Sequence, residues 1–239
     1  MDIEKKTNQQ RTIVVAGGTG ALGGSVARAF LATGARVIAT FVKQAEYDAL
    51  AKQAGEGLIG VSLDVTDEKA VAQFVAETES KYGAIDALVI AVGGYAGGKQ
   101  LWETDTATYD MMLSLNLRAA FVMTRAILPG MIRQNRGAIA NVASKAGYGH
   151  AAGAAMYAAS KAGVMALFDS LAEEVKPYNI NVNSIVPSIM DTPSNRRAMP
   201  KADFNVWPKT DDIAKVIVYL CSDDARVIHG AAVPVYGRT

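Results

Sequence analysis

Short runs of β-branched and other apolar residues alternate with longer amphipathic stretches along almost all of this 239-residue chain. The runs predicted to be strands are 12–16, 36–41, 58–63, 87–92, 138–142, 180–186 and 231–235. The stretches predicted to be helices are 21–33, 45–54, 67–82, 106–129, 154–175 and 211–221, with Thr66 as the N-cap of the third and Gly83 as its stop. Such alternation predicts a parallel sheet of about seven strands with right-handed crossovers and helices on both faces. No repeat or linker divides the chain and half of its residues are hydrophobic, so residues 1–239 are expected to form a single doubly wound α/β domain.

The charge and the scarcity of cysteine and histidine argue against several classes of function. The net charge is +1 and the lysines and arginines are scattered, which argues against a nucleic-acid partner. The single cysteine, Cys221, cannot form an intrachain disulfide, and His150 and His229 have no partner at metal-ligand spacing. The first residues are polar, and no uninterrupted apolar run has the length of a membrane span. We therefore expect a cytoplasmic protein with no metal, nucleic-acid or membrane partner, acting on a small-molecule substrate.

A glycine-rich segment, V-V-A-G-G-T-G-A-L-G-G, joins the first predicted strand to the first predicted helix. Gly17, Gly20 and Gly23 allow a tight turn and a close approach of the backbone to a pyrophosphate, and the helix N-terminus behind them supplies N–H donors. The alternative is a glycine-rich turn without a ligand. The position between strand and helix favours the dinucleotide site.

The end of the second predicted strand bears on which dinucleotide is bound. In this type of site an acidic residue there binds the ribose 2′-hydroxyl of NAD. Here the segment R-V-I-A-T-F-V-K contains Thr40, Phe41 and Lys43 and no carboxylate. NADP(H) is therefore favoured, with NAD(H) as the alternative. Lys43 is predicted either to pair with a 2′-phosphate or to be a solvated surface lysine.

The segment M-Y-A-A-S-K-A-G, residues 156–163, places Tyr157 and Lys161 four residues apart, so that both face one side of a predicted helix. A free tyrosine has a pKa of about 10. A neighbouring ammonium favours the phenolate and is expected to lower the pKa of Tyr157 toward the working range. The pair therefore predicts an acid–base group.

These elements occur in an order that resembles the short-chain dehydrogenase/reductase family over nearly the whole chain. After the glycine loop the matching elements are Asp64 in L-D-V-T, Asn116 in S-L-N-L, Ser144 in N-V-A-S, Tyr157 with Lys161, and V-N-S-I-V-P-S followed by Thr192. The resemblance implies a Rossmann-type fold and a nicotinamide cofactor. It also implies a homo-oligomer, tetramer or dimer, built on the helices that carry Asn116 and Tyr157.

The resemblance further implies a role for each site residue. Tyr157 would be the proton donor, and Lys161 would tune it and bind the nicotinamide ribose. Ser144 would stabilise charge on the substrate oxygen. Asn116 would hold a water of a proton relay to Lys161. The cofactor contacts implied in the same way are Gly17, Thr19, Gly20, Leu22, Gly23, Thr40, Phe41, Lys43, Asp64, Val65, Val92, Gly93, Tyr157, Lys161, Pro187, Ile189 and Thr192.

Two segments depart from the family pattern and resemble dihydropteridine reductases. One is G-G-Y-A-G-G at 93–98, close to where the family commonly has N-N-A-G, and the other is 191–207. The second lies within 187–209, a long segment without sustained periodicity that is expected to be a substrate-binding lid. Ser144 instead favours a C=O or C–OH substrate, because reduction of a quinonoid pterin needs hydride and a proton on nitrogen and involves no carbonyl oxygen to polarise.

Three functions therefore remain open on the sequence. The first is hydride transfer between a nicotinamide and a small carbonyl or alcohol. The second is a dihydropteridine reductase-like activity, and the third is a non-catalytic NAD(P)-binding sensor. Trp102 is expected either in the substrate pocket or beneath the long helix, and the other substrate-pocket residues predicted are Tyr95, Met199, Phe204 and Trp207.

Overall fold

The computed structural model describes residues 10–150 and 152–239, which form one seven-stranded sheet between two layers of helices. The strand order is β3-β2-β1-β4-β5-β6-β7 and every neighbouring pair is parallel. The strands are β1 (Thr12–Ala16), β2 (Arg36–Phe41), β3 (Leu58–Ser62), β4 (Ala87–Ile90), β5 (Gly137–Val142), β6 (Ile180–Pro187) and β7 (Ala232–Val235). The predicted doubly wound parallel sheet is confirmed.

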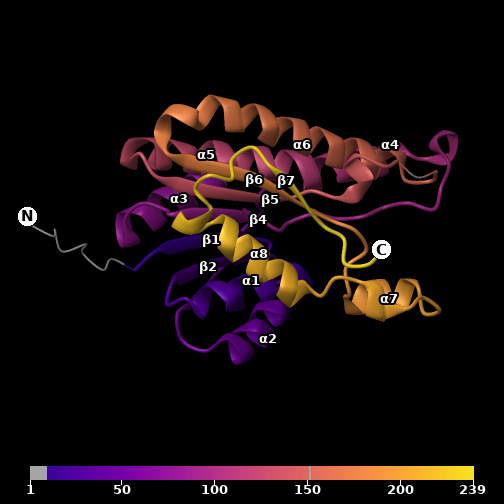
Figure 1. The fold of residues 1–239 in the computed structure, drawn as a ribbon, viewed down its shortest axis with the longest axis horizontal. Coiled ribbons are helices and arrows are strands. Elements are labelled where there is room, and N and C mark those ends of the chain that lie inside the picture. Colours follow the sequence, from indigo (N-terminus) through magenta and orange to yellow (C-terminus); the bar gives the residue numbers. More distant parts are fainter. Residues whose placement is uncertain (1–9, 151) are drawn as a thin grey trace, which may run out of the picture.

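The helices divide between the two faces of the sheet (Figure 1). They are α1 (Ala21–Leu31), α2 (Gln44–Ala54), α3 (Glu68–Tyr82), α4 (Thr106–Met112), α5 (Ala119–Gln134), α6 (Ala155–Val175), α7 (Pro193–Ala198) and α8 (Thr210–Leu220). Figure 1 shows α3, α5 and α6 above the sheet and α1, α2 and α8 below it. The segments that follow the strands, including α7, gather at the right-hand edge of that view.

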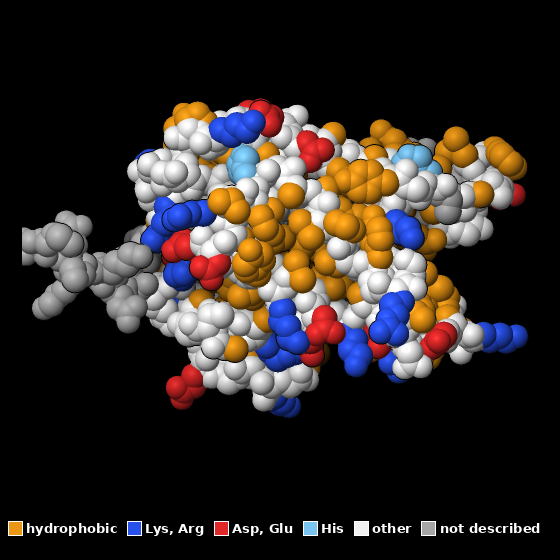
Figure 2. Space-filling view, in the orientation of Figure 1, with side chains coloured by type: hydrophobic (Ala, Val, Ile, Leu, Met, Phe, Trp, Pro, Cys, Tyr) orange, Lys and Arg blue, Asp and Glu red, His pale blue; other side chains and the backbone are white. Residues whose placement is uncertain are grey.

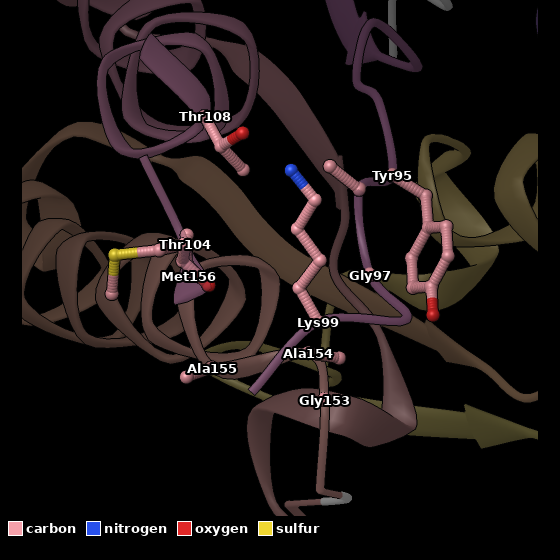
Figure 3. Close-up of a pocket in the computed structure, with 10 residues that line it drawn as sticks. Tyr95, Gly97, Lys99, Thr104, Thr108, Gly153, Ala154, Ala155 and Met156 are labelled. Atoms are coloured by element: carbon pink, nitrogen blue, oxygen red, sulfur yellow. The ribbon is translucent and has the colours of Figure 1, made fainter. Parts of the chain in front are cut away.

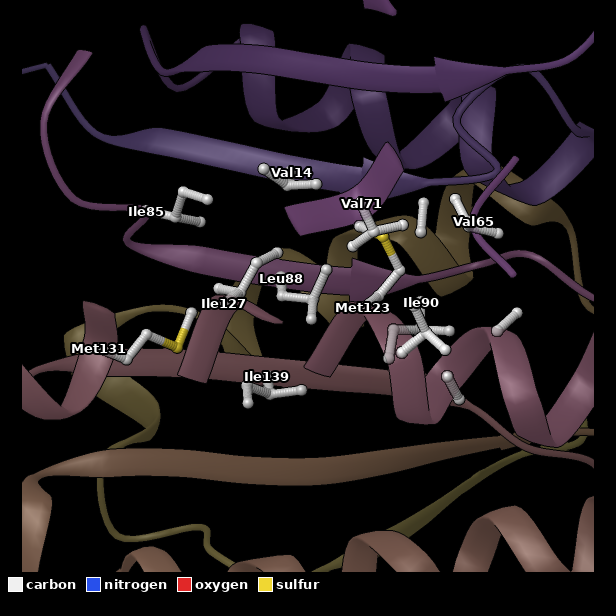
Figure 4. Packing of buried hydrophobic residues seen from close by; sticks show 14 of the residues in the cluster. Val14, Val65, Val71, Ile85, Leu88, Ile90, Met123, Ile127, Met131 and Ile139 are labelled. Atoms are coloured by element: carbon white, nitrogen blue, oxygen red, sulfur yellow. The ribbon is translucent and has the colours of Figure 1, made fainter. Parts of the chain in front are cut away.

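The central strands are apolar along their whole length because helices cover both of their faces. Every residue of β1 and β4 is buried. Figure 4 shows Leu88 and Ile90 of β4 packed with Met123 and Ile127 of α5, and all four side chains are at most 1% exposed. Burying a side chain of this size contributes about 1.5–3 kcal/mol to folding. This double-sided core fixes the strand ends from which the site is built.

The start of α3 differs from the prediction by one residue. The N-cap is Asp67, whose carboxylate accepts hydrogen bonds from the N–H groups of Lys69 and Ala70. The predicted cap, Thr66, instead donates its hydroxyl to Asp64. The carboxylate of Asp67 is a stronger acceptor for the helix N–H groups than the hydroxyl of Thr66, so the helix begins after Asp67. Gly83 ends the helix at a φ of 80°, as predicted.

The long helix predicted from 106 to near 129 or just beyond ends at Gln134 and is not α-helical throughout. A π-helical turn, Leu113–Arg118, joins α4 to α5, and the helix continues past Pro129. By length and apolar composition alone Thr106–Gln134 is long enough to cross a membrane. Its buried side chains, however, pack against the sheet, so it is a core helix of the domain.

The segment 187–209 was predicted to be irregular, and this is wrong for 193–198. Pro193 opens α7 at a position where its missing N–H costs nothing, and the Thr192 hydroxyl caps the helix by accepting from the N–H of Asn195. The last residues of the chain contact the same segment. The N–H of Arg238 donates to the carbonyl of Val206, and the Thr239 hydroxyl donates to the Ser188 hydroxyl.

Candidate active site

The predicted site residues meet at the carboxyl ends of the strands, where the strand order reverses between β1 and β4. Open α/β sheets bind their ligands at this switch point. The glycine loop follows β1, Gly93 follows β4, Ser144 follows β5 and Pro187 ends β6. Residues far apart in the sequence are therefore collected at one edge.

The glycine loop forms a cradle that side chains would fill. Gly17 has a φ of 75°, and a Cβ added to it would lie 2.8 Å from the Cα of Val92. A Cβ on Gly23 would lie 2.1 Å from the carbonyl oxygen of Gly17. Gly20 is the N-cap of α1 and provides no side-chain cap, so the first N–H groups of the helix face the cradle without a capping side chain. A closely approached backbone and helix N–H donors fit the pyrophosphate of a dinucleotide.

Thr40 supports this loop from the neighbouring strand. Its hydroxyl accepts a hydrogen bond from the N–H of Gly17, and its carbonyl accepts one from the N–H of Gly18. Thr40 is 1% exposed. The structure therefore places this predicted cofactor contact behind the loop, where it holds Gly17 and Gly18 in position.

The start of α2, next to the glycine loop, contains two residues that the sequence analysis missed. The ring of Tyr47 stacks on Phe41 at a centroid distance of 4.9 Å. The carboxylate of Glu46 accepts from the Lys43 ammonium at 3.0 Å and from the Thr19 hydroxyl at 3.3 Å. Both residues lie on α2, beyond the strand end where an acid was sought. An acid in the first turn of the helix after the second strand was the available signal for Glu46.

Asp64 and Val65 follow β3 at the same edge. Val65 is buried, whereas the Asp64 carboxylate is exposed and accepts from both the hydroxyl and the N–H of Thr66. These hydrogen bonds hold the pKa of Asp64 below its usual range. The carboxylate is therefore ionised and fixed in direction at neutral pH.

Lys161 is a buried cation next to the glycine segment that follows β4. Its side chain donates to the carbonyl of Val142 at 2.8 Å, and burial lowers its pKa to about 8. A Cβ on Gly93 would lie 3.5 Å from the Lys161 Nζ and 2.7 Å from the Asn116 Oδ1. Glycine at position 93 therefore leaves open a space that these two polar groups border.

Tyr157 is half-buried on α6, and its phenol lies next to the side chain of Ser144. Burial raises the pKa of the Tyr157 phenol, the side chain of Ser144 lowers it, and the net direction is upward. The expectation of a lowered pKa is therefore wrong for this structure. The reason is that the Lys161 ammonium binds the Val142 carbonyl and does not offset the loss of solvent around the phenol.

Asn116 lies in the π-helical turn and uses its amide to hold the segment after β4. Its Oδ1 accepts from the N–H of Gly94, and its Nδ2 donates to the carbonyl of Gly94 and to the hydroxyl of Ser160. Because the amide is engaged with Gly94 and Ser160, the predicted water relay stays a prediction. Ser160, which precedes Lys161, is a further residue that the sequence analysis missed.

A cavity of about 360 Å³ opens beside this group (Figure 3). Tyr95 lines the cavity, and its ring meets the ring of Tyr157 edge-on at a centroid distance of 4.9 Å. Figure 3 shows the Lys99 side chain reaching across the cavity toward Thr108. The remaining lining residues are Ala96, Gly97, Thr104, Gly153, Ala154, Ala155 and Met156.

The other predicted substrate residues do not line this cavity. Phe204 and Trp207 pack on each other at 5.0 Å, and Trp207 is 6% exposed in a separate groove with Pro208, Val235 and Gly237. Met199, which follows α7, is half-buried. Trp102 is 83% exposed, which contradicts both positions expected for it.

Three further predicted cofactor contacts are placed by the secondary structure. Leu22 is buried in the first turn of α1, and Ile189 is 41% exposed after the end of β6. The Thr192 hydroxyl is occupied as the cap of α7. Among the residues that the structure describes, there is no group of three His, Cys, Asp or Glu side chains placed to hold a metal ion.

Comparison with known proteins agrees with this arrangement. Residues 11–203 match the family model of the short chain dehydrogenases. The 3-oxoacyl-[acyl-carrier-protein] reductase FabG of Thermotoga maritima is 30% identical over 239 residues, covering 95% of this chain and 96% of that protein. The 2-(R)-hydroxypropyl-CoM dehydrogenase of Xanthobacter autotrophicus is 29% identical over 243 residues, covering 95% and 97%.

Solved structures share the whole architecture. ElxO with NADP bound superposes with a TM-score of 0.89 at 25% sequence identity, covering 95% of this chain and 98% of that one. The family match, the seven-stranded sheet and the residues gathered at its carboxyl edge lead to one conclusion. This chain belongs to the short-chain dehydrogenase/reductase family and is an NAD(P)-dependent oxidoreductase.

Proposed function

We propose that this protein is an NADP(H)-dependent reductase of small carbonyl compounds, and the dehydrogenase of the corresponding alcohols, with Tyr157 as the proton donor. The observation that carries the proposal is where α6 meets the end of β5. There the Tyr157 phenol lies next to the side chain of Ser144, and one turn further along α6 the buried Lys161 ammonium donates to the Val142 carbonyl. A carbonyl oxygen that accepts from both hydroxyls would sit where charge develops during reduction.

The cofactor assignment rests on the shape and charge of the cradle. Gly17 and Gly23 leave room only for backbone, and Lys43 offers a cation on the adenosine side. ElxO, with the same fold, is a structure with NADP bound. When bound, the nicotinamide supplies the hydride. The dinucleotide would lie across the strand ends and be held by the glycine loop, Asp64, Val65 and the Val92–Gly93 segment.

Each side chain has a separate part in the reaction. With hydride supplied to the carbonyl carbon by the bound nicotinamide, the Tyr157 hydroxyl would give its proton to the carbonyl oxygen, which would yield the alcohol. The raised pKa keeps the Tyr157 phenol protonated until that step. Lys161 stabilises the phenolate that is left, which then takes a proton from solvent. Asn116 holds Gly94 and thereby the floor of the site.

Reduction of quinonoid dihydropterins is the second candidate. It is supported by the Tyr95 ring, which lies in the 93–98 segment, lines the cavity and contacts the ring of Tyr157. A flat heterocycle can stack on an aromatic wall of this kind. A non-catalytic NAD(P)-binding sensor is the third candidate.

The deciding experiment follows oxidation of NADPH and of NADH by the purified protein. Ketones and β-ketoesters are offered in one series and quinonoid dihydropterin in the other. Turnover of ketones that is lost in Ser144→Ala and retained in Ser62→Ala, a control on the exposed end of β3, supports the proposal. Turnover of the pterin alone overturns it in favour of the second candidate. Binding of NADPH without any turnover favours the sensor.

We also propose a cytoplasmic homo-oligomer, tetramer or dimer. The continuous helix over α4 and α5 exposes Tyr109, Met111 and Phe121, each more than two-fifths accessible. Figure 2 shows further hydrophobic side chains gathered in the middle of the molecule's face, over the region of the edge strand β7. Burial of such surfaces is the usual reason for association. Sedimentation at several protein concentrations measures the state, and a monomer throughout contradicts it.

A further inference from the structure

The carboxylate of Glu46 lies between two groups predicted to contact the cofactor. One oxygen accepts from Lys43 at 3.0 Å and the other accepts from Thr19 at 3.3 Å. Thr19 belongs to the glycine loop, and Lys43 is the N-cap of α2, just past the end of β2. An acidic side chain therefore connects the two segments that flank the adenosine position.

The position of Glu46 matches the chemistry of ribose recognition. Dinucleotide sites place an acid about 20 residues after the glycine loop, where it binds the ribose 2′-hydroxyl, or a cation that accepts a 2′-phosphate. This chain has no acid at the end of β2 but has both a cation and an acid in the next turn. The neighbouring Tyr47 stacks on Phe41 with an interplanar angle of 9°, which fixes the start of α2 and with it the direction of Glu46.

We propose that Glu46 determines the choice between NADH and NADPH. Its carboxylate accepts a hydrogen bond from the 2′-hydroxyl of NADH. For NADPH, the 2′-phosphate must replace Glu46 as the partner of Lys43 and is repelled by the carboxylate it replaces. This inference rests on the cofactor site of the proposed function and adds a specificity-determining residue to it.

The exposure of the pair indicates how strong this effect is. The side chains of Lys43 and Glu46 are 72% and 44% exposed, and ion pairs in such positions are weak and screened by salt. A 2′-phosphate can therefore displace Glu46, so the native protein accepts both cofactors. The carboxylate reduces the preference for NADPH without abolishing NADPH binding.

The test is to measure the Kd of each cofactor for the full chain by quenching of protein fluorescence, without substrate. Glu46→Gln keeps the shape and the acceptor for Thr19 but removes the charge. We expect its Kd for NADPH to fall and its Kd for NADH to rise, so that their ratio changes at least about tenfold, a difference of about 1.4 kcal/mol. Glu46→Ala should shift the ratio in the same direction. The shift should become smaller as salt is raised.

Two control variants isolate the effect. Asp48→Asn removes another exposed acid of α2, one that accepts a hydrogen bond from Gln44, and should leave the ratio unchanged. Adding Lys43→Met to Glu46→Gln should cancel the gain in NADPH affinity, because the phosphate then has no cation to bind.

The outcomes separate this inference from the proposed function. A native protein that binds both cofactors and a Glu46→Gln variant whose ratio stays within twofold overturn the role of Glu46 and leave the proposed function standing. An equal shift in Asp48→Asn also overturns it, since the effect is then one of overall charge. A native protein that binds neither cofactor overturns the proposed function and this inference together.

Discussion

The ammonium of Lys161 is held by a backbone carbonyl and buried beneath the glycine segment, which makes it costly to keep charged. Burial lowers its pKa from the ordinary 10.5 to about 8. The folded state therefore releases this proton at a lower pH than the unfolded state does. A buried charge of this kind lowers the stability of the folded state, so stability alone does not explain its presence at this edge of the sheet.

The cost of this charge predicts a pH dependence of stability. Between pH 8 and 10.5 the unfolded chain binds more protons at Lys161 than the folded chain, so stability rises with pH across that window. Below pH 8 the cost is fully present and constant. The native protein should gain about 3 kcal/mol relative to Lys161→Met between the two ends of the window. Urea unfolding of both proteins at pH 7, 9 and 10.5 measures the difference, and a constant difference would contradict the buried charge.

Tyr157→Phe tests the proton donor at the same scale. The variant removes one hydroxyl and keeps the ring that packs on Tyr95. Loss of a positioned acid lowers turnover by about 10²–10⁴-fold, and we expect kcat to fall by this amount while the Kd of NADPH changes little. Tyr178→Phe, on the exposed end of the turn after α6, should retain full turnover. Unchanged kcat in Tyr157→Phe would rule out this donor.

Individual residues were predictable where their chemistry and spacing identify them. Tyr157 and Lys161 were placed on one helix from their four-residue spacing alone. Ser160 was missed because nothing in its local sequence shows what it touches. Glu46 was missed because an acid was expected at the end of the second strand, whereas Glu46 lies in the first turn of the next helix. The raised pKa of Tyr157 was also missed. It depends on how strongly burial acts on the phenol and on where the Lys161 ammonium points, and the sequence gives neither.

At the scale of elements, the π-helical turn Leu113–Arg118 connects the long helix to the active site. Turns of this kind are rare and occur often at functional sites. Here the turn places Asn116, which is 2% exposed, against both Gly94 and Ser160. The same amide therefore joins α6, the segment after β4 and the long helix.

Removing that amide should loosen three elements together. Asn116→Ala deletes the hydrogen bonds to Gly94 and Ser160, and we expect a loss of about 1–3 kcal/mol of stability with lower turnover. Asn205→Ala is the matched control, because the side chain of Asn205 is exposed and binds only Asp203. Urea midpoints of the two variants make the comparison. Equal effects would mean that the Asn116 contacts add nothing.

The boundaries of helices and strands were predictable only where the sequence marks them with particular residues. The bounds of β1 and β2 were predicted to the residue, because glycine and charge mark their ends. The π-helical turn was not predicted, since one residue more in a helical turn changes no hydrophobic pattern over so short a length. The helix at 193–198 was missed because it is only six residues long and buries none of its residues, so it leaves no hydrophobic period in the sequence.

At the scale of the whole molecule, the two halves of the sheet carry different parts of the site. The half built from β1, β2 and β3 holds the glycine cradle, and the half built from β5, β6 and β7 carries Ser144, Tyr157 and the segment with α7. A dinucleotide lying across the switch point would touch both halves. Cofactor binding should therefore stabilise the fold as a unit.

This predicts a thermal shift. NADPH at about 100 times its Kd adds about 2.7 kcal/mol to the stability of the folded state. For a chain of this size that amount raises Tm by about 5–10 °C. Differential scanning fluorimetry with NADPH, and with AMP as a ligand of the adenosine side alone, makes the measurement. Each ligand is added at the same multiple of its own Kd. Equal rises in Tm with AMP and with NADPH agree with the linkage between binding and stability. No rise in Tm with NADPH contradicts the cofactor site.

The architecture was the most predictable level, because strand and helix periodicity repeat many times along the chain. The position of Trp102, 83% exposed on the surface, was not predictable, since single aromatic residues carry no periodic signal.

The contacts between the last residues and the segment 187–209 have a consequence for recombining this chain with its relatives. Arg238 and Thr239 bind Val206 and Ser188, and Gly237 packs so closely on Pro208 that a Cβ there would lie 2.7 Å from the carbonyl of Val206. The segment 187–209 and the C-terminal residues therefore have to be exchanged together when parts of related chains are combined. A graft of 187–209 from another member of the family would need that member's residues at 236–239 to come with it.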